Sequence, residues 1–217
     1  MKTTSLMNKF LIISLFLITI GQMNIVYAGN ESKGADMNSK NLEKSTFAGG
    51  CFWCMQHPFD ELTGVVSTAV GYTGGQRENP TYEEVCAGKT GHAEAIEIQY
   101  DSSQIAYSRL LDIFWRNIDP TTFNRQFADV GTQYRTAIFY HNDKQKSLAE
   151  ASKEEMDMSG IYDKPVVTEI TPASTFYKAE EYHQKYYEKC PVRYKLYKSG
   201  SGREQYLEKT WEAELEQ

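Results

Sequence analysis

The segment Cys51-Phe52-Trp53-Cys54 holds the residues best suited to chemistry. Two glycines, Gly49-Gly50, precede it and let the backbone turn sharply. We expect Cys51 to cap a helix, where free backbone N–H groups and the helix dipole favour a thiolate over a thiol. Phe52 and Trp53 would set two apolar surfaces beside this nucleophile. Reactive sulfur next to an aromatic wall indicates chemistry on a small apolar group.

Glu94 is a candidate general acid. It lies in residues 92–99, whose alternation puts His92, Glu94, Ile96 and Ile98 on one face of a predicted strand. Desolvation on an apolar face raises a carboxyl pKa, and a carboxylic acid that stays protonated near neutral pH can donate a proton. A strand-edge glutamate facing water is the alternative, and periodicity alone does not decide between the two.

The chain has four cysteines, namely Cys51, Cys54, Cys86 and Cys190. A disulfide framework is one interpretation for an exported protein, but the body is long enough to fold without one, and two of the cysteines share a CxxC. We therefore expect a redox-active set. Cys51, Cys54, Cys86 and His92 could in principle bind zinc, but Cys86 has no nearby cysteine partner, so we predict no metal site. Cys86 can also be a small buried residue.

The elements that must position these residues alternate along the chain. Pro58 should end or kink the helix after Cys51, because it lacks a backbone N–H. We expect surface helices in two segments rich in tyrosine and charge, near 177–189 and 203–214. Further predicted strands are 45–48, 65–70, 134–140 and 165–170, and further predicted helices are 105–116 and 142–158. This order predicts an α+β fold, a two-layer sandwich.

The first residues are typical of a secretory signal. Lys2 and Lys9 supply positive charge, residues 10–20 are apolar but short for a membrane span, and Val26-Tyr27-Ala28 suits cleavage after Ala28. We expect residues 1–28 to be a signal peptide and the protein to be periplasmic or secreted, without stable membrane association after cleavage. An uncleaved N-terminal anchor is the alternative.

We expect three further segments after the signal: a polar, disordered leader over 29–43, the body over 44–211 and a short tail over 212–217. Removing the signal takes away two lysines and no acids, so the formal charge falls from −6 to about −8. This acidic body has no basic surface for nucleic acid, so we expect no nucleic-acid partner.

Several separated motifs in the body resemble one enzyme family. In chain order they are Gly49-Gly50-Cys51-Phe52-Trp53, Gly71-Tyr72-Thr73-Gly74-Gly75, Asn79-Pro80-Thr81-Tyr82, Thr90-Gly91-His92-Ala93-Glu94-Ala95 and Gly131-Thr132-Gln133-Tyr134-Arg135. Together they are similar to the A-type peptide methionine sulfoxide reductases, which act on the S epimer of methionine sulfoxide. The resemblance covers roughly residues 44–211, the catalytic domain, and several motifs in order are far more specific than one CxxC.

The resemblance implies a ferredoxin-like plait with added helices, and it assigns roles by position. The nucleophile falls on Cys51 and the acid on Glu94. The pocket for the substrate methyl group falls on Phe52 and Trp53. The partners of the sulfoxide oxygen fall on Tyr82 and Tyr134, and Asp129 belongs to the supporting set.

The implied activity is thiol-dependent reduction of free and protein-bound methionine S-sulfoxide. Glu94 would protonate the sulfoxide oxygen while Cys51 attacks sulfur and becomes a sulfenic acid. A second thiol then forms a disulfide, which an external, thioredoxin-like dithiol reduces. No bound cofactor is implied. The expected partners are oxidised proteins or peptides and the dithiol donor, and the expected role is repair of exported proteins under oxidative stress.

The chain departs from the family pattern in its tail. Many members carry resolving cysteines in a glycine-rich C-terminal extension, whereas residues 211–217 contain none. The resolving candidates are Cys54, which is nearest, and Cys190, which precedes Pro191 in a predicted loop; Cys86 and an external thiol remain open. We favour Cys54, because a CxxC at a helix start can close to a disulfide.

The rival interpretation is a thioredoxin-like exported dithiol oxidoreductase that uses Cys51 and Cys54. A strand, a CxxC and a helix occur in the right order for it. A secreted binding module with incidental thiols is a third class. The motifs around Glu94 and over 71–75 favour the sulfoxide reductase over the dithiol oxidoreductase, because a simple dithiol enzyme has no use for them.

Overall fold

The structure is a computed structural model that describes residues 41–215, and the side chains as far as residue 211. The predicted signal peptide and nearly all of the predicted leader lie outside the described residues. The strands are β1 (Leu42–Gly49), β2 (Val65–Thr73), β3 (Ala93–Asp101), β4 (Arg125–Gln126), β5 (Asp129–Val130), β6 (Thr136–Tyr140), β7 (Glu169–Pro172) and β8 (Tyr177–Lys178). The α-helices are α1 (Phe52–Asp60), α2 (Tyr82–Cys86), α3 (Tyr107–Trp115), α4 (Asp143–Met158), α5 (Tyr186–Lys189), α6 (Pro191–Gly200) and α7 (Arg203–Leu215). Two 3₁₀ helices are η2 (Thr132–Tyr134) and η3 (Glu181–His183).

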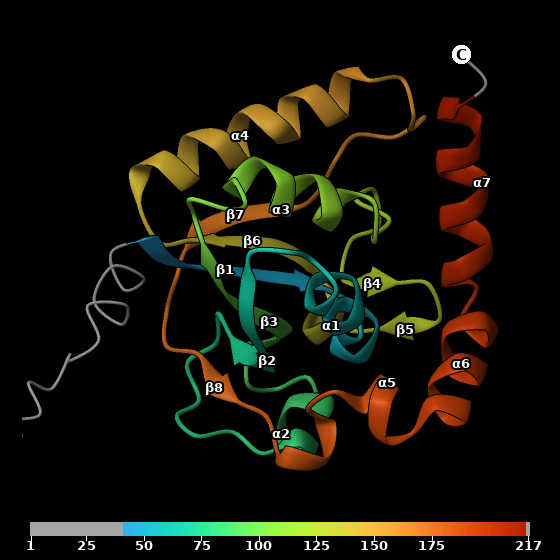
Figure 1. Cartoon of the computed structure of the whole chain (residues 1–217). Coiled ribbons are helices and arrows are strands. Elements are labelled where there is room, and N and C mark those ends of the chain that lie inside the picture. Colours follow the sequence, from blue (N-terminus) through green and yellow to red (C-terminus); the bar gives the residue numbers. More distant parts are fainter. Residues whose placement is uncertain (1–40, 216–217) are drawn as a thin grey trace, which may run out of the picture. The chain divides into compact units, whose positions relative to one another are not determined.

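Six strands form one mixed sheet in the order β7-β6-β1-β3-β2-β8 (Figure 1). Only β6 and β7 pair in parallel among these neighbours. The central strands and two helices follow the order β1-α1-β2-β3-α3-β6, and β3 lies between β1 and β2. This is the split βαβ pattern of a ferredoxin-like plait, so the predicted α+β class is confirmed.

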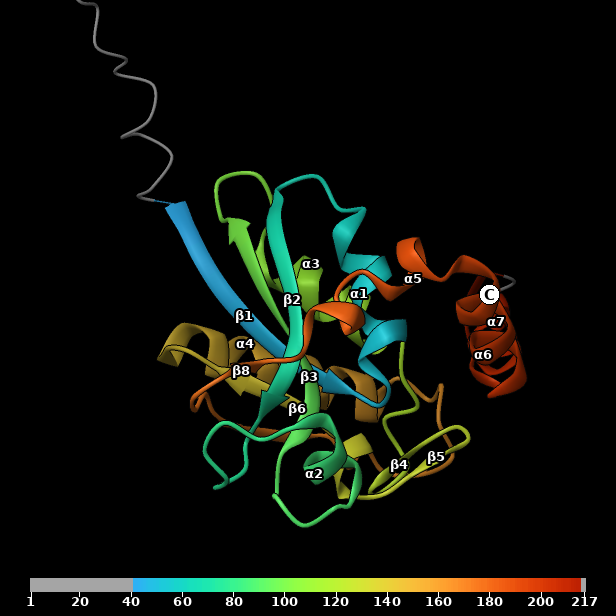
Figure 2. The same cartoon turned by 90° about the horizontal axis from the view of Figure 1, so that it is seen from below.

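Helices α1, α3 and α4 pack against the sheet and enclose the main core (Figures 1 and 2). Phe47 on β1 stacks on Phe59 of α1 and on Phe114 of α3, with ring centroids 5.7 and 5.0 Å apart. Ile96 and Ile98 of β3 belong to the same core, whereas Ala93 and Ala95 belong to a smaller cluster. The predicted alternation of this strand is therefore confirmed.

Several predicted boundaries differ from the structure. Helix α1 runs through Pro58 to Asp60, because a proline removes one hydrogen bond of the last turn without ending the helix. Strand β1 begins at Leu42, inside the predicted leader, and α7 continues to Leu215, beyond the predicted end of the body. Strand β7 begins at Glu169, whereas the predicted strand begins at residue 165.

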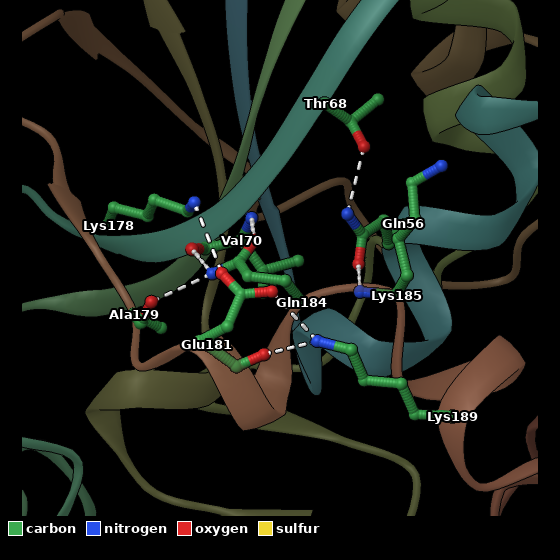
Figure 3. Close-up of polar contacts among 9 residues, drawn as sticks. All are labelled: Gln56, Thr68, Val70, Lys178, Ala179, Glu181, Gln184, Lys185 and Lys189. Atoms are coloured by element: carbon green, nitrogen blue, oxygen red, sulfur yellow. Dashed lines mark hydrogen bonds and ion pairs between the residues drawn. The ribbon is translucent and has the colours of Figure 1, made fainter.

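The segment 177–189 is the largest departure from prediction. Instead of one surface helix it forms β8, η3 and the short α5. Gln184 explains the difference: its side chain accepts from the Val70 backbone N–H and donates to the carbonyls of Val70 and Ala179 (Figure 3). Gln56 of α1 also accepts from the Lys185 backbone N–H. These bonds fix the segment against β2 and α1.

The sequence analysis predicted no helix where α6 lies, whereas α7 agrees with the helix predicted near 203–214. Residue 190, predicted to lie in a loop, is the residue between α5 and α6, and Pro191 occupies the first turn of α6, where its missing N–H costs nothing. Helices α5 and α6 contact each other, and so do α6 and α7. Within residues 41–215, none of the helices has the length and apolar character needed to cross a membrane.

Candidate active site

Cys51 occupies the turn between β1 and α1. Gly50 has φ of 79°, and a Cβ atom there would lie 2.4 Å from the Cβ of Gln126, so only glycine fits. Cys51 stands at the N-cap position of α1, but its side chain makes no capping hydrogen bond. The prediction that Cys51 occupies the cap position of a helix is therefore confirmed.

The carboxyl group of Glu94 on β3 accepts a hydrogen bond from the first residue of α1. The Phe52 backbone N–H donates to Glu94 Oε2 over 3.1 Å. Glu94 is 2% exposed, so it does not face water. Burial raises its pKa to about 8, against the opposing effect of the Phe52 hydrogen bond. The carboxyl group is therefore mostly protonated at neutral pH, as a general acid requires.

The thiols of Cys51 and Cys54 are both buried, one at the N-cap of α1 and the other in its first turn. Burial raises the pKa of the Cys51 thiol, and Cys54 and the carboxylate form of Glu94 add to the rise. The hydrogen bond from Cys51 lowers the pKa of Cys54 to about 7, helped by the positive charge of Arg203. Burial of the Cys51 sulfur therefore works against the resting thiolate that the sequence predicts there.

The tyrosines predicted to hold the sulfoxide oxygen lie on two separate elements. Tyr82 begins α2, and its backbone N–H donates to Glu180 Oε1 over 3.0 Å. Tyr134 ends η2. Burial raises both tyrosine pKa values, and the charge of Glu94 raises both further, so the two hydroxyls stay protonated donors close to that carboxyl group. We call Glu94, Tyr82 and Tyr134 the oxygen side of Cys51.

Phe52 and Trp53 form an aromatic cluster with His183 and Tyr186. Phe52 is 1% exposed, and its ring centroid lies 5.0 Å from that of His183. Trp53 stacks on Tyr186 with centroids 3.9 Å apart. The Trp53 Nε1–H donates to His183 Nδ1 over 3.0 Å, so the neutral His183 carries its proton on Nε2. Burial lowers the pKa of His183, which keeps it neutral.

Three residues from the C-terminal helices also border the thiols, and the sequence interpretation did not name them as site residues. They are Tyr186, Tyr197 and Arg203, which we call the C-terminal side of Cys51. Arg203 is 2% exposed and donates to the carbonyl of Gly49 over 2.8 Å and to that of Asn117 over 2.5 Å. Its guanidinium lies over the Phe127 ring. The arginine thus ties α7 to the end of β1, next to Cys51.

Tyr197 links two predicted site residues. Its ring packs edge-on against Trp53 at 5.7 Å between centroids. Its hydroxyl donates to Asp129 Oδ2. Asp129 lies on β5, and burial raises the pKa of its carboxyl group. Tyr197 thereby connects Asp129 to Trp53.

The two other cysteines lie outside this cluster. Cys86 ends α2, and its thiol shares a hydrogen bond with the Tyr82 hydroxyl. Cys190 packs beside Tyr186 and Tyr194. In the part of the chain that the structure describes, no set of three or more His, Cys, Asp and Glu side chains is arranged to hold a metal ion.

Comparisons with known proteins agree on one family. The family model described as Peptide methionine sulfoxide reductase matches residues 43–215. The Peptide methionine sulfoxide reductase MsrA of Bacillus licheniformis is 56% identical over 173 residues, which are 80% of this chain and 96% of that protein. Its namesake from Bacillus subtilis is 54% identical over 175 residues, 81% of this chain and 99% of that protein.

Solved structures give the same result. The reduced form of Mxr1 from Saccharomyces cerevisiae superposes with a TM-score of 0.64 at 37% identity, covering 70% of this chain and 87% of that one. Methionine sulfoxide reductase A of Corynebacterium diphtheriae gives 0.62 at 35% identity, covering 70% and 76%. The chain belongs to the A-type peptide methionine sulfoxide reductases (MsrA).

Proposed function

We propose that Cys51 reduces methionine S-sulfoxide by direct attack on sulfur, with Glu94 as the proton donor. Membership of the MsrA family makes the chain a peptide-methionine (S)-S-oxide reductase. The observation that carries the residue assignment is the buried, protonated carboxyl group of Glu94, which is fixed by the first N–H of the helix that Cys51 begins.

In the first step, Glu94 protonates the sulfoxide oxygen while Tyr82 and Tyr134 hold it by hydrogen bonds. The Cys51 sulfur attacks the sulfoxide sulfur and forms a sulfur–sulfur bond, and the proton lost by the thiol replaces the one that Glu94 donates. The protonated oxygen then passes to the Cys51 sulfur as the original sulfur–oxygen bond and the sulfur–sulfur bond both break, which leaves Cys51 as a sulfenic acid. Methionine leaves as the reduced product. Phe52 and Trp53 receive the methyl group of the substrate, and Asp129 supports the site from β5.

In the second step, Cys54 resolves the sulfenic acid. Its sulfur attacks the Cys51 sulfur, water leaves, and a Cys51–Cys54 disulfide remains. Two features support Cys54 over Cys190: it lies buried in the first turn of the helix that Cys51 begins, and its pKa, lowered to about 7, supplies a thiolate at neutral pH. An external thioredoxin-like dithiol then reduces the disulfide. The cycle needs no bound cofactor or metal, and its substrates are oxidised peptides, proteins and free methionine sulfoxide.

Replacing each cysteine in turn tests this sequence of steps. Cys51→Ser should abolish reduction, because it removes the nucleophile. Cys54→Ser should still form one equivalent of methionine per enzyme and then stop, because only resolution is lost. Cys190→Ser is the matched control and should turn over normally, because Cys54 and not Cys190 resolves the sulfenic acid. Loss of the first turnover in Cys54→Ser, together with Cys54-dependent disulfide exchange on other proteins, would favour a thioredoxin-like dithiol oxidoreductase instead.

We propose in addition that the enzyme is exported and repairs oxidised proteins in the periplasm or outside the cell. The support is the basic, apolar start of the chain with small residues before position 29, and the family match that begins only at residue 43. Cell fractionation with mass analysis of the purified protein tests this. A mature N-terminus at residue 29 in the exported fraction is expected. A full-length chain in the membrane fraction would indicate an uncleaved anchor, and one in the cytosol would contradict export.

A further inference from the structure

The carboxyl group of Glu180 is bonded to two parts of the substrate site, and the proposed steps give it no role. Its Oε1 accepts from the Tyr82 backbone N–H over 3.0 Å, and its Oε2 accepts from the Tyr72 hydroxyl over 2.9 Å. Tyr72 is buried, and its ring packs against that of Phe52 with centroids 6.0 Å apart. Glu180 thus joins the first residue of α2 to a neighbour of the methyl pocket.

His183 gives Glu180 a second link to the same pocket. The Nε2 atom of His183 lies 4.0 Å from Glu180 Oε2 and has no hydrogen-bond partner among the described residues, although the side chain is 1% exposed. Its Nδ1 accepts from Trp53, and its ring centroid lies 4.4 Å from that of Tyr82 and 5.0 Å from that of Phe52. Because the neutral imidazole then carries its proton on Nε2, the charge of Glu180 favours the tautomer that Trp53 requires.

The carboxyl group of Glu180 is ionised at neutral pH. Burial opposes its ionisation, but hydrogen bonds from its own backbone N–H, from the Tyr82 N–H and from the Tyr72 hydroxyl lower its pKa. Hydrogen bonds to a charged group are about twice as strong as those between neutral groups. The carboxylate therefore holds both of its partners more firmly than a neutral acceptor would.

The two pockets for the sulfoxide lie on different helices. Phe52 and Trp53 belong to α1, whereas Tyr82 begins α2, a helix of five residues. So short a helix has little stability of its own, so the bonds at its ends decide where Tyr82 lies. Its capping box is internal to the segment, whereas the bond to Glu180 ties its first N–H to the surroundings of the methyl pocket.

We propose that Glu180 is a positioning residue that determines specificity: it fixes the oxygen donor Tyr82 relative to the methyl pocket of Phe52 and Trp53. This proposal rests on the proposed roles of those three residues. A sulfoxide sulfur carries an oxygen, a methyl group, a methylene group and a lone pair. When the methylene chain and the attacking sulfur are fixed, exchange of the oxygen and methyl positions turns one epimer into the other. Selection of the S epimer therefore requires that the oxygen donors and the methyl pocket keep fixed places relative to each other.

Competition between two substrates measures this specificity and does not depend on how much of the enzyme is active. An equimolar mixture of methionine S-sulfoxide and ethionine S-sulfoxide tests the fit of the methyl group, and mass spectrometry separates the two products. A mixture of the S and R epimers of methionine sulfoxide tests the handedness of the site, and chromatography of the unreacted sulfoxide gives the ratio. Dithiothreitol serves as the reductant in both.

Glu180→Ala should lower both the methyl-to-ethyl ratio and the S-to-R ratio about tenfold, because a well-fixed pocket discriminates one methylene by roughly 10–200-fold. Glu180→Gln keeps an acceptor for the Tyr82 N–H but loses the charge beside His183, so it should lower both ratios less. Glu181→Ala is the matched control, since it removes a neighbouring exposed carboxylate that pairs with Lys178 and Lys189 (Figure 3). It should leave both ratios unchanged.

Tyr72→Phe supplies a second arm that leaves Glu180 in place. It removes one hydrogen bond to the carboxylate and keeps the ring against Phe52, so both ratios should fall about threefold. This effect should be absent in the Glu180→Ala background, because the bond that Tyr72→Phe removes no longer exists there.

A methyl-to-ethyl or S-to-R ratio that stays at the wild-type value in Glu180→Ala or in Tyr72→Phe would overturn the role of Glu180. Slower reduction of both competing substrates by the same factor has that meaning too, because it is the signature of a purely structural role. An equal shift in Glu181→Ala would likewise contradict it. Failure of the proposed function is a separate outcome, since it would be seen as an undiminished rate in Tyr82→Phe or as sulfoxide reduction by Cys51→Ser.

Discussion

The oxygen side and the C-terminal side of Cys51 differ in how they are built and in what they do. The oxygen side consists of Glu94, Tyr82 and Tyr134, which come from separate family motifs and act on the substrate oxygen in the proposed mechanism. The C-terminal side consists of Tyr186, Tyr197 and Arg203, which come from the C-terminal helices and contact Trp53 or the end of β1 next to Cys51. In the proposed mechanism, proton delivery therefore belongs to one part of the fold and the surroundings of the thiols to another, so mutations should separate them.

The largest separable effect is expected on the oxygen side. Glu94→Gln removes the proton donor and should slow the single turnover roughly 10²–10⁴-fold. Because burial raises the pKa of Glu94 to about 8, the wild-type single-turnover rate should fall as pH rises through that value, and the variant should lack this fall. Rapid-quench measurement of methionine across this range checks both points. Glu97→Gln, on the same strand and ion-paired with Lys44, is the control. A Glu94→Gln rate near that of wild type would remove the acid from the mechanism.

The same residue should set a pH dependence of stability. The folded-state pKa of about 8 lies above the unfolded value of about 4.3, so between these values the folded protein binds more protons and loses stability as pH rises. Glu94→Gln has no such titration, so its stability relative to wild type should increase by about 5 kcal/mol between about pH 4 and pH 9. Urea unfolding at both ends of this range measures it. A constant difference between the two proteins would contradict the burial of an ionisable carboxyl group.

On the C-terminal side, Arg203 should matter for stability more than for chemistry. Arg203→Lys keeps the charge but cannot reach the carbonyls of both Gly49 and Asn117, so unfolding should become easier by about 2 kcal/mol. Urea unfolding is again the measurement, with the exposed Arg193→Lys as the control. An Arg203→Lys protein as stable as wild type would mean that α7 is held by other contacts. The fall in turnover rate near pH 8 should remain, since Glu94 is untouched.

The smallest effect is expected at His183, whose ring packs against Phe52 and Trp53. His183→Phe retains a ring against Phe52 but leaves the Trp53 N–H without its acceptor. We expect KM for methionine sulfoxide to rise about fivefold, with little change in kcat. Steady-state kinetics measure this, and the exposed neighbour Tyr182→Phe is the control. A fall in kcat with KM unchanged would instead place His183 in the chemical step.

The sequence predicts the oxygen side better than the C-terminal side, for physical reasons. Period-two alternation places Glu94 on the same face of β3 as Ile96 and Ile98, which makes burial one of the two outcomes that the sequence allows for it. No local pattern indicates that Arg203 is buried, because its partners are carbonyl groups more than 80 residues away in the chain. In the same way, 177–189 has a helical composition, but the hydrogen bonds of Gln184 to Val70 hold it in another form.

The ionisation of the two thiols could not be predicted from the CxxC either. A helix N-terminus favours a thiolate only where its N–H groups reach the sulfur, and here the first N–H is directed at Glu94. The sequence places Cys51 and Cys54 on one turn, but the pKa of each depends on residues from β3, α6 and α7. Side-chain roles of this kind become visible only when the distant elements have been placed.

The central claim is that Cys51 alone attacks the sulfoxide and that Cys54 then closes the disulfide. Mass spectrometry of the enzyme after one equivalent of methionine S-sulfoxide, with peptide mapping of the cross-link, tests it most directly. The account predicts loss of two hydrogen atoms and a single Cys51–Cys54 linkage, and a trapped sulfenic acid on Cys51 in Cys54→Ser. A disulfide that excludes Cys51, or a sulfenic acid on another cysteine, would contradict it.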